Sequence, residues 1–198
     1  MNEIIGIWIA TSPDKAKTEK YVFNGDGTFE YSTTATGKAD RKLTGKFEYV
    51  DQNLTLHYDN SNPGTSTMKG VGVDKNKMCI GYKKVHANES TLVGVWCSES
   101  IVVYGVESAN STKVDTFLTA VLYNNKFNSF CKVKINDKQS TVTNSAGTYS
   151  LKDGNITLEN ENGANTAYFN NGTHAYYIIS DVLVIVNDIT WNALFIKS

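Results

Sequence analysis

Two short motifs occur twice in the same order, and this repetition limits the fold of the chain more than any other feature. A Gly-x-Trp motif recurs after 88 residues, as Gly6-Ile7-Trp8 and Gly94-Val95-Trp96. A Gly-x-aromatic motif followed eight residues later by Asn-x-Thr-Leu recurs after 102 residues, starting at Gly45 and at Gly147. Recurrence of ordered motifs is typical of a repeated structural unit. We therefore predict duplication of a domain of about 90 to 105 residues, with about 14 extra residues between the anchors of the second copy.

Most of the chain has the alternation of apolar and polar residues that half-buried strands require. Phe29, Tyr31 and Thr33, for example, alternate with Glu30 and Ser32. Gly- and Asn-rich turns separate these runs, as at Asn24-Gly25-Asp26-Gly27, where glycine supplies the positive φ of a hairpin turn. No amphipathic helical run of ten residues is present. The pattern predicts an all-β fold of two tandem small antiparallel barrels or sandwiches.

The predicted domain boundary lies in the polar, unpatterned segment 86–91. We expect a first β domain at residues 1–87 with about seven strands, and a second, longer one at residues 91–198 with nine or ten. The first copy lacks a counterpart of the strand at residues 190–197. Either its barrel is smaller, or the other domain covers its edge, since an open edge invites unwanted pairing.

Composition excludes several classes of protein. The 19 basic and 20 acidic residues nearly balance, so neither half has the positive field that nucleic-acid binding needs. No stretch is long and apolar enough to span a membrane. The three cysteines, Cys79, Cys97 and Cys131, have no metal-type spacing and are expected to be buried free thiols. Met1 leads almost directly into a predicted strand without a signal peptide, which fits either a cytosolic start or a chain trimmed of its export signal.

No catalytic grouping is recognisable in the sequence. The three histidines, His57, His86 and His174, are scattered, and no phosphate-binding glycine loop, zinc-binding helix motif or nucleophile elbow is present. We therefore expect a non-enzymatic protein with no metal and no cofactor. A small enzyme that uses the mouth of a barrel is the least favoured of the functions considered.

The ordered motifs resemble the lipocalin-like (calycin-type) β-barrel domains of bacterial envelope proteins. Such domains open with Gly-x-Trp, continue through an aromatic strand, an Asn/Asp/Gly turn and Gly-Thr-aromatic, and close with a strand that ends in Lys or Arg. The closing segments here are Gly81-Tyr82-Lys83-Lys84 and Leu194-Phe195-Ile196-Lys197. The resemblance covers almost the whole chain, and it implies a periplasmic or cell-surface location.

Physical reasoning assigns the closure of each barrel to a tryptophan and a lysine. Trp8 and Trp96 would each close one end of a barrel, and the preceding glycine would let another backbone pass close by. Lys84 and Lys197 would lie across the indoles as cation–π partners, each tryptophan contacting the closing strand of its own half. Lysine stands where this family often has arginine.

The aromatic residues of the second copy predict a ligand site inside its barrel. Alternation turns Phe127, Cys131 and Tyr149 inward, together with either Tyr176 or Tyr177, of which we assign Tyr176 to the site. An eight-stranded barrel has room for side chains alone or for one small ligand. The favoured function is a binding protein for a small apolar molecule. The alternative is an envelope or surface interaction module, with filled barrels, that binds a protein partner.

Overall fold

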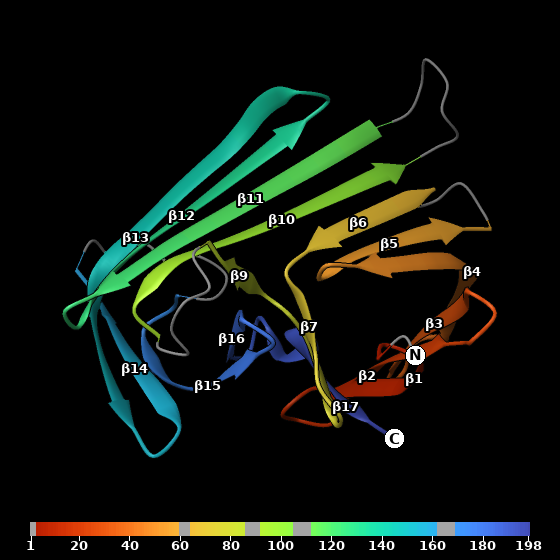
Figure 1. The fold of residues 1–198 in the computed structure, drawn as a ribbon, viewed down its shortest axis with the longest axis horizontal. Coiled ribbons are helices and arrows are strands. Elements are labelled where there is room, and N and C mark those ends of the chain that lie inside the picture. The colour runs from red at the N-terminus through yellow and green to blue at the C-terminus, as the bar shows by residue number, and fades with distance from the viewer. Residues whose placement is uncertain (1–2, 60–63, 86–91, 105–111, 162–168) are drawn as a thin grey trace.

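The computed structural model describes residues 3–59, 64–85, 92–104, 112–161 and 169–198, and the all-β prediction is confirmed (Figure 1). Within them the elements are strands and one short 3-10 helix, η1 (Trp191–Ala193). The strands of the first half are β1 (Gly6–Thr11), β2 (Lys17–Phe23), β3 (Thr28–Ala35), β4 (Arg41–Val50), β5 (Asn53–Tyr58), β6 (Thr65–Lys69), β7 (Val71–Val73), β8 (Lys77–Ile80) and β9 (Tyr82–Lys84). Those of the second half are β10 (Gly94–Tyr104), β11 (Thr112–Tyr123), β12 (Lys126–Ile135), β13 (Lys138–Lys152), β14 (Asn155–Asn160), β15 (Gly172–Ile179), β16 (Val182–Val186) and β17 (Leu194–Lys197). The predicted linker, 86–91, lies outside the described residues.

Eight strands form a closed antiparallel barrel. Each strand from β10 to β16 pairs with the next, and β9 closes the ring by pairing with both β16 and β10. Closure leaves no free edge along the paired stretches of this ring. The long strands β10 to β13 continue past the ring as a broad sheet, which spans the upper part of Figure 1.

The remaining strands form a second ladder that returns close to its own start. From β7 it runs through β8, β17, β1, β2, β3, β4 and β5 to β6. β6 and β7 are consecutive in the chain and are separated by Gly70 alone. β6 also pairs with β10, and this pairing joins the second ladder to the barrel.

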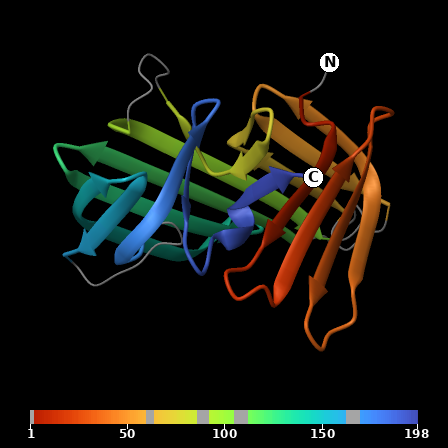
Figure 2. The ribbon, with the colours of Figure 1, turned by 90° about the horizontal axis from the view of Figure 1, so that it is seen from below.

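The two halves of the sequence exchange their closing strands. β9 comes from the first half but completes the barrel of the second. β17 comes from the second half and lies between β1 and β8, as the blue strand among the red and yellow ones in Figure 2. The apparent shortage of strands in the first half is thus made up by β17, which covers the edge of β1. The structure therefore agrees with the second alternative drawn from the sequence, in which the other half of the chain covers this edge.

Two glycines explain why the first half has nine strands where the pattern predicts about seven. Gly70 divides the run at residues 68–74 into β6 and β7, and Gly81 divides the run at 77–85 into β8 and β9. A Cβ at Gly70 would lie 2.4 Å from the carbonyl oxygen of Gly81, and a Cβ at Gly81 would lie 2.1 Å from that of Leu183. Backbones therefore cross in direct contact at this point, and only glycine permits it.

Three apolar clusters fill the molecule. The first lies among the strands of the first half with Phe195 of β17, and the second lies inside the closed barrel with Tyr82 of β9. The third joins the halves, because Cys79 of β8 packs with Ile179, Val182, Val184 and Ala193. The exchanged strands are therefore held by apolar packing as well as by ladder hydrogen bonds.

Candidate functional site

The ligand residues predicted from alternation do not gather around an open space. Phe127 and Tyr149 are buried, with 2% and 5% of their surface exposed, and they belong to the cluster inside the barrel. Tyr176 packs against the same cluster, whereas Tyr177 packs against the cluster that joins the halves, so Tyr176 is the inward residue of the two. Cys131 is half-buried, four residues along β12 from Phe127. None of these residues lines any of the cavities described below.

Aromatic side chains occupy the barrel interior beside Phe127. The ring of Phe169 stacks on that of Phe127 with 5.2 Å between centroids, and Tyr82 meets Phe169 edge-on at 5.9 Å. Trp96 and Phe169 are fully buried in the same cluster. The closing strand β9 thus contributes Tyr82 to the filling of the barrel.

The two predicted tryptophans occupy matching environments and are both fully buried, as the sequence predicts. The indole nitrogen of Trp8 donates to the carbonyl of Ile4 at 2.7 Å, and that of Trp96 donates to the carbonyl of Leu92 at 2.9 Å. The preceding glycines, Gly6 and Gly94, have φ of 140° and 146°. Each tryptophan is therefore buried with its one polar atom satisfied.

The two lysines over these indoles are exchanged relative to the expectation. The Nζ of Lys197 lies 5.1 Å from the ring of Trp8, and that of Lys84 lies 5.3 Å from the ring of Trp96. The expectation that each tryptophan contacts the closing strand of its own half is wrong, because β17 pairs with β1 and β9 pairs with β10. Sequence periodicity identifies a strand but not the strand with which it pairs.

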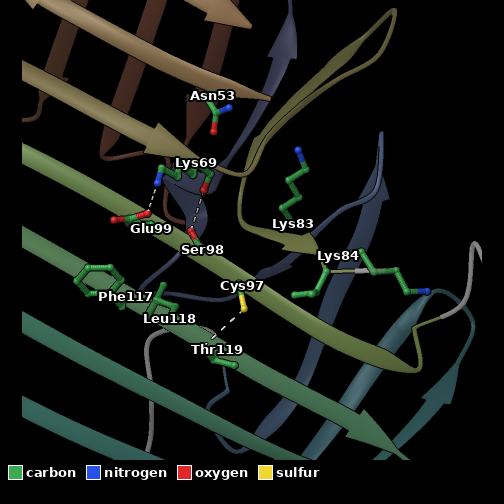
Figure 3. A pocket seen from close by; sticks show the side chains of 11 residues that line it. Asn53, Lys69, Lys83, Lys84, Cys97, Ser98, Glu99, Phe117, Leu118 and Thr119 are labelled. Atoms are coloured by element: carbon green, nitrogen blue, oxygen red, sulfur yellow. Dashed lines mark hydrogen bonds and ion pairs between the residues drawn. The ribbon is translucent and has the colours of Figure 1, made fainter. Parts of the chain in front are cut away.

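An open cavity of about 440 Å³ lies where the two halves meet, and we call it the junction pocket (Figure 3). It lies where β10 changes partners, because β10 pairs with β9 at Trp96 and Cys97 and with β6 from Glu99 onward. Ser98 stands at the fork, and its hydroxyl donates to the carbonyl of Lys69 at 3.2 Å. The wall consists of Asn53, Lys69, Lys83, Lys84, Val85, Cys97, Ser98, Glu99, Phe117, Leu118 and Thr119.

The junction pocket combines an apolar floor with a charged rim. Cys97 and Phe117 lie on one face of β10 and β11 and form the floor, whereas Leu118 also lines the pocket but packs against the cluster inside the barrel. The thiol of Cys97 lies 3.8 Å from the hydroxyl of Thr119. At the rim Lys69 pairs with Glu99, and the ammonium of Lys83 donates to the carbonyl of Asp51 at 3.1 Å. A concave, largely apolar site with a few polar groups is the usual form of a small-molecule site, and its volume lies within the common range of about 300–1,000 Å³.

Three other hollows adjoin one another around Pro13, on a different part of the surface. They measure about 330, 420 and 510 Å³. Trp191 lines two of them, and Ile9, Leu194 and Ile196 add apolar surface to one. Their walls hold no lysine–carboxylate pair among the described contacts.

The histidines and cysteines of the described residues are scattered and do not form a metal site. The described part of the chain contains no group of three or more His, Cys, Asp or Glu side chains placed to hold a metal ion. His174 lies 3.0 Å from the carbonyl of Asn170, His57 is exposed on β5, and His86 lies outside the described residues. The cysteines are free, but Cys79 alone of the three is buried, contrary to the expectation for Cys97 and Cys131. No helix among these residues is long and apolar enough to cross a membrane.

Sequence reasoning missed the junction pocket because its walls come from strands that alternation treats as unrelated. The signals present were indirect: the glycines that interrupt two strand runs, and the length of the segment that became β10. Comparison of the chain with family models, with curated proteins and with solved structures gives no match. Function is therefore argued from the site itself.

Proposed function

We propose that this chain is a non-enzymatic binding protein, built from two lipocalin-like β-barrels related by duplication, that holds a small apolar ligand in the junction pocket. The junction pocket is the observation that carries the proposal, because it joins an apolar floor to a polar rim. Our sequence expectation put the ligand inside the second barrel. The side chains of Phe127, Tyr149 and Phe169 pack together inside that barrel. This packing favours the junction pocket as the ligand site.

Matched hydrogen bonds and close contacts support the duplication. The amide of Phe47 donates to the carbonyl of Gly27 at 2.9 Å, and that of Tyr149 donates to the carbonyl of Asn125 at 2.8 Å. A Cβ at Gly45 would lie 1.9 Å from the carbonyl oxygen of His57, and one at Gly147 would lie 2.0 Å from that of Glu159. These pairs occupy corresponding positions of the repeated motifs, so the motifs encode the same local structure twice.

The path of the second ladder supports a second barrel. β6 and β7 are one strand bent at Gly70, whose φ is 97°, and the amides of Gly70 and Val71 both donate to the carbonyl of Gln52. Counted as one bent strand, they bring the second ladder to eight strands, β17 included. Both units then follow the same eight-stranded plan.

Binding of a neutral hydrophobic dye tests this function. Nile red should bind saturably, and it should slow the alkylation of Cys97 while leaving that of Cys131 unchanged, with each cysteine followed by peptide mass spectrometry. Thr119→Trp should block binding by filling the junction pocket. Tyr123→Trp is the matched control, because Tyr123 lies on the same strand, is 48% exposed and is not part of the wall. Protection of Cys131 in place of Cys97 would put the ligand inside the barrel, and no saturable binding would exclude a ligand carrier.

An interaction module is the second candidate, and exposed isoleucines favour it. Ile7 and Ile196 are 36% and 48% exposed, and Ile196 lies opposite Ile9 in the β1–β17 pair beside the Pro13 hollows. Contiguous exposed apolar surface is typical of protein contacts. Ile196→Lys should then abolish capture of a protein partner and leave Nile red binding intact.

A further inference from the structure

Building on the proposed function, we infer that the ligand of the junction pocket is a single-chain amphiphile with a carboxylate head group, which Lys83 receives. The apolar chain lies over Phe117 and Cys97, and the head group lies at the rim.

Lys83 is a cation at the rim whose described partner is neutral. It points outward from β9 and stands directly opposite Cys97 in the β9–β10 pair. Its ammonium has three donors, and the described contact uses one of them, to the carbonyl of Asp51. Among the ion pairs of the described residues none involves Lys83. An anion at the rim would therefore meet an uncompensated charge.

The second rim cation limits the charge of the ligand. Lys69 pairs with Glu99, whose side chain is only 22% exposed. The carboxylate of Glu99 sits in the wall, and Lys83 can neutralise one negative charge of a ligand. The second charge of a dianion would then lose water beside Glu99 without a cation to pair with, which is costly. Among the described lysines of the pocket wall, Lys83 is the one whose charge faces the rim without an acidic partner, and this favours a single negative charge on the ligand, as on a carboxylate.

Lys84 contributes its stem and not its charge to the junction pocket. Its ammonium lies over Trp96, and Figure 3 shows it directed away from Lys83 and Lys69. The methylene stem packs against Gly94, where a Cβ would approach Cε to 3.0 Å. The head group is thus held at the Lys83 side of the rim, and the apolar part extends over the floor.

Protection of Cys97 from iodoacetamide, measured on the intact chain, tests the inference with three ligands of one chain length. Decanoate, decanol and decyltrimethylammonium differ only in head group, and each is used below its micelle concentration. Decanoate should protect Cys97 at about fivefold lower concentration than decanol, and decyltrimethylammonium should protect least. Decyl phosphate, a dianion, should be weaker than decanoate. Cys131 is the internal reference and should not respond.

Charge variants separate the role of Lys83 from general effects. Lys83→Gln should remove the advantage of decanoate over decanol, and Lys83→Arg should keep it. Lys126→Gln is the matched control, because this exposed lysine begins β12 outside the junction pocket. Glu99→Gln should strengthen decanoate binding, because it removes a negative charge and releases Lys69.

The outcomes distinguish the inference from the function on which it rests. Equal protection by decanoate and decanol, or an unchanged preference in Lys83→Gln, overturns the carboxylate inference and leaves the binding function standing. Failure of all three ligands and of Nile red removes both. Stronger binding of decyl phosphate than of decanoate would replace the monoanion with a phosphate-type ligand.

Discussion

The ammonium of Lys197, in the last strand, lies over the ring of Trp8, in the first strand, at 5.1 Å from its centre. The reciprocal contact places Lys84 over Trp96 at 5.3 Å. Each half of the sequence therefore supplies the residue that covers the tryptophan of the other. The stability of either tryptophan site consequently depends on both halves.

Coupling between each tryptophan and its lysine can be measured directly. Trp8→Ala and Trp96→Ala should each reduce the free energy of unfolding by about 3–5 kcal/mol, because each leaves a cavity in a fully buried site. A double-mutant cycle should give a coupling energy of about 0.5–1 kcal/mol for Trp8 with Lys197. The cycle for Trp8 with Lys84 should give a value near zero. Coupling of Trp8 to Lys84 instead would contradict the exchange of closing strands.

Removal of residues 194–198 should destabilise the first half more than the second. β17 pairs with β1 and β8, and Phe195 is buried in the first cluster. Hydrogen exchange should therefore speed up in β1 and β8, while the amides of β11 and β12 keep their protection. Loss of protection confined to the barrel of β9 to β16 would contradict this assignment of β17.

Two equivalent glycines should be equally intolerant of a side chain. Gly45→Ala and Gly147→Ala each place a Cβ at 1.9 or 2.0 Å from a carbonyl oxygen, far inside van der Waals contact, so the strands must separate. We expect each to cost at least about 1–3 kcal/mol in chemical denaturation. Gly25→Ala is the control, because nothing lies within 4 Å of the added atom, and its effect should be within about 0.5 kcal/mol. A tolerated alanine at either site would show that these backbones do not touch.

Alkaline pH should destabilise the protein through two neutral acids, the buried Cys79 and the half-buried Tyr49. Burial raises the pKa of Cys79 to about 12 and that of Tyr49 to about 12, and the Tyr49 hydroxyl donates to the carbonyl of Val71 at 2.9 Å. In the unfolded chain these groups ionise near about 8.5 and about 10. Their contribution is complete below those values and is lost as the pH rises toward the folded pKa values. Unfolding midpoints should fall above about pH 9, less steeply in Tyr49→Phe, and a midpoint independent of pH up to 11 would argue against burial of both groups.

The sequence predicted the elements of the fold better than their partners. Alternation and turn residues identified the strands, and the repeated motifs identified Trp8 and Trp96 as buried. The closing segments Tyr82-Lys83-Lys84 and Phe195-Ile196-Lys197 both place a basic side chain where it can cover an indole. Local pattern therefore does not decide which segment covers which tryptophan, because that depends on long-range strand pairing.

For the candidate site, too, the sequence predicted local features but not long-range contacts. Phe127, Tyr149 and Tyr176 were correctly turned inward by alternation, but an inward direction does not distinguish a packed core from a cavity. The junction pocket depends on the fork of β10 between β6 and β9, which is a long-range pairing. Lys83 and Cys97, far apart in the pattern, become neighbours only through that pairing.

The exchange of β9 and β17 also sets the order in which the two halves can complete their strand pairing during synthesis. A ribosome adds about 5–20 residues per second, so β17 emerges several seconds after β8, the strand beside which it must lie. Throughout that interval the edges of β1 and β8 have no β17 to pair with, although the strands from β1 to β8 have already left the ribosome. The barrel of the second half also waits, because β9 pairs with β16, but β16 ends at Val186, before β17 begins at Leu194. The half of the protein that is translated first is therefore the half that finishes folding last.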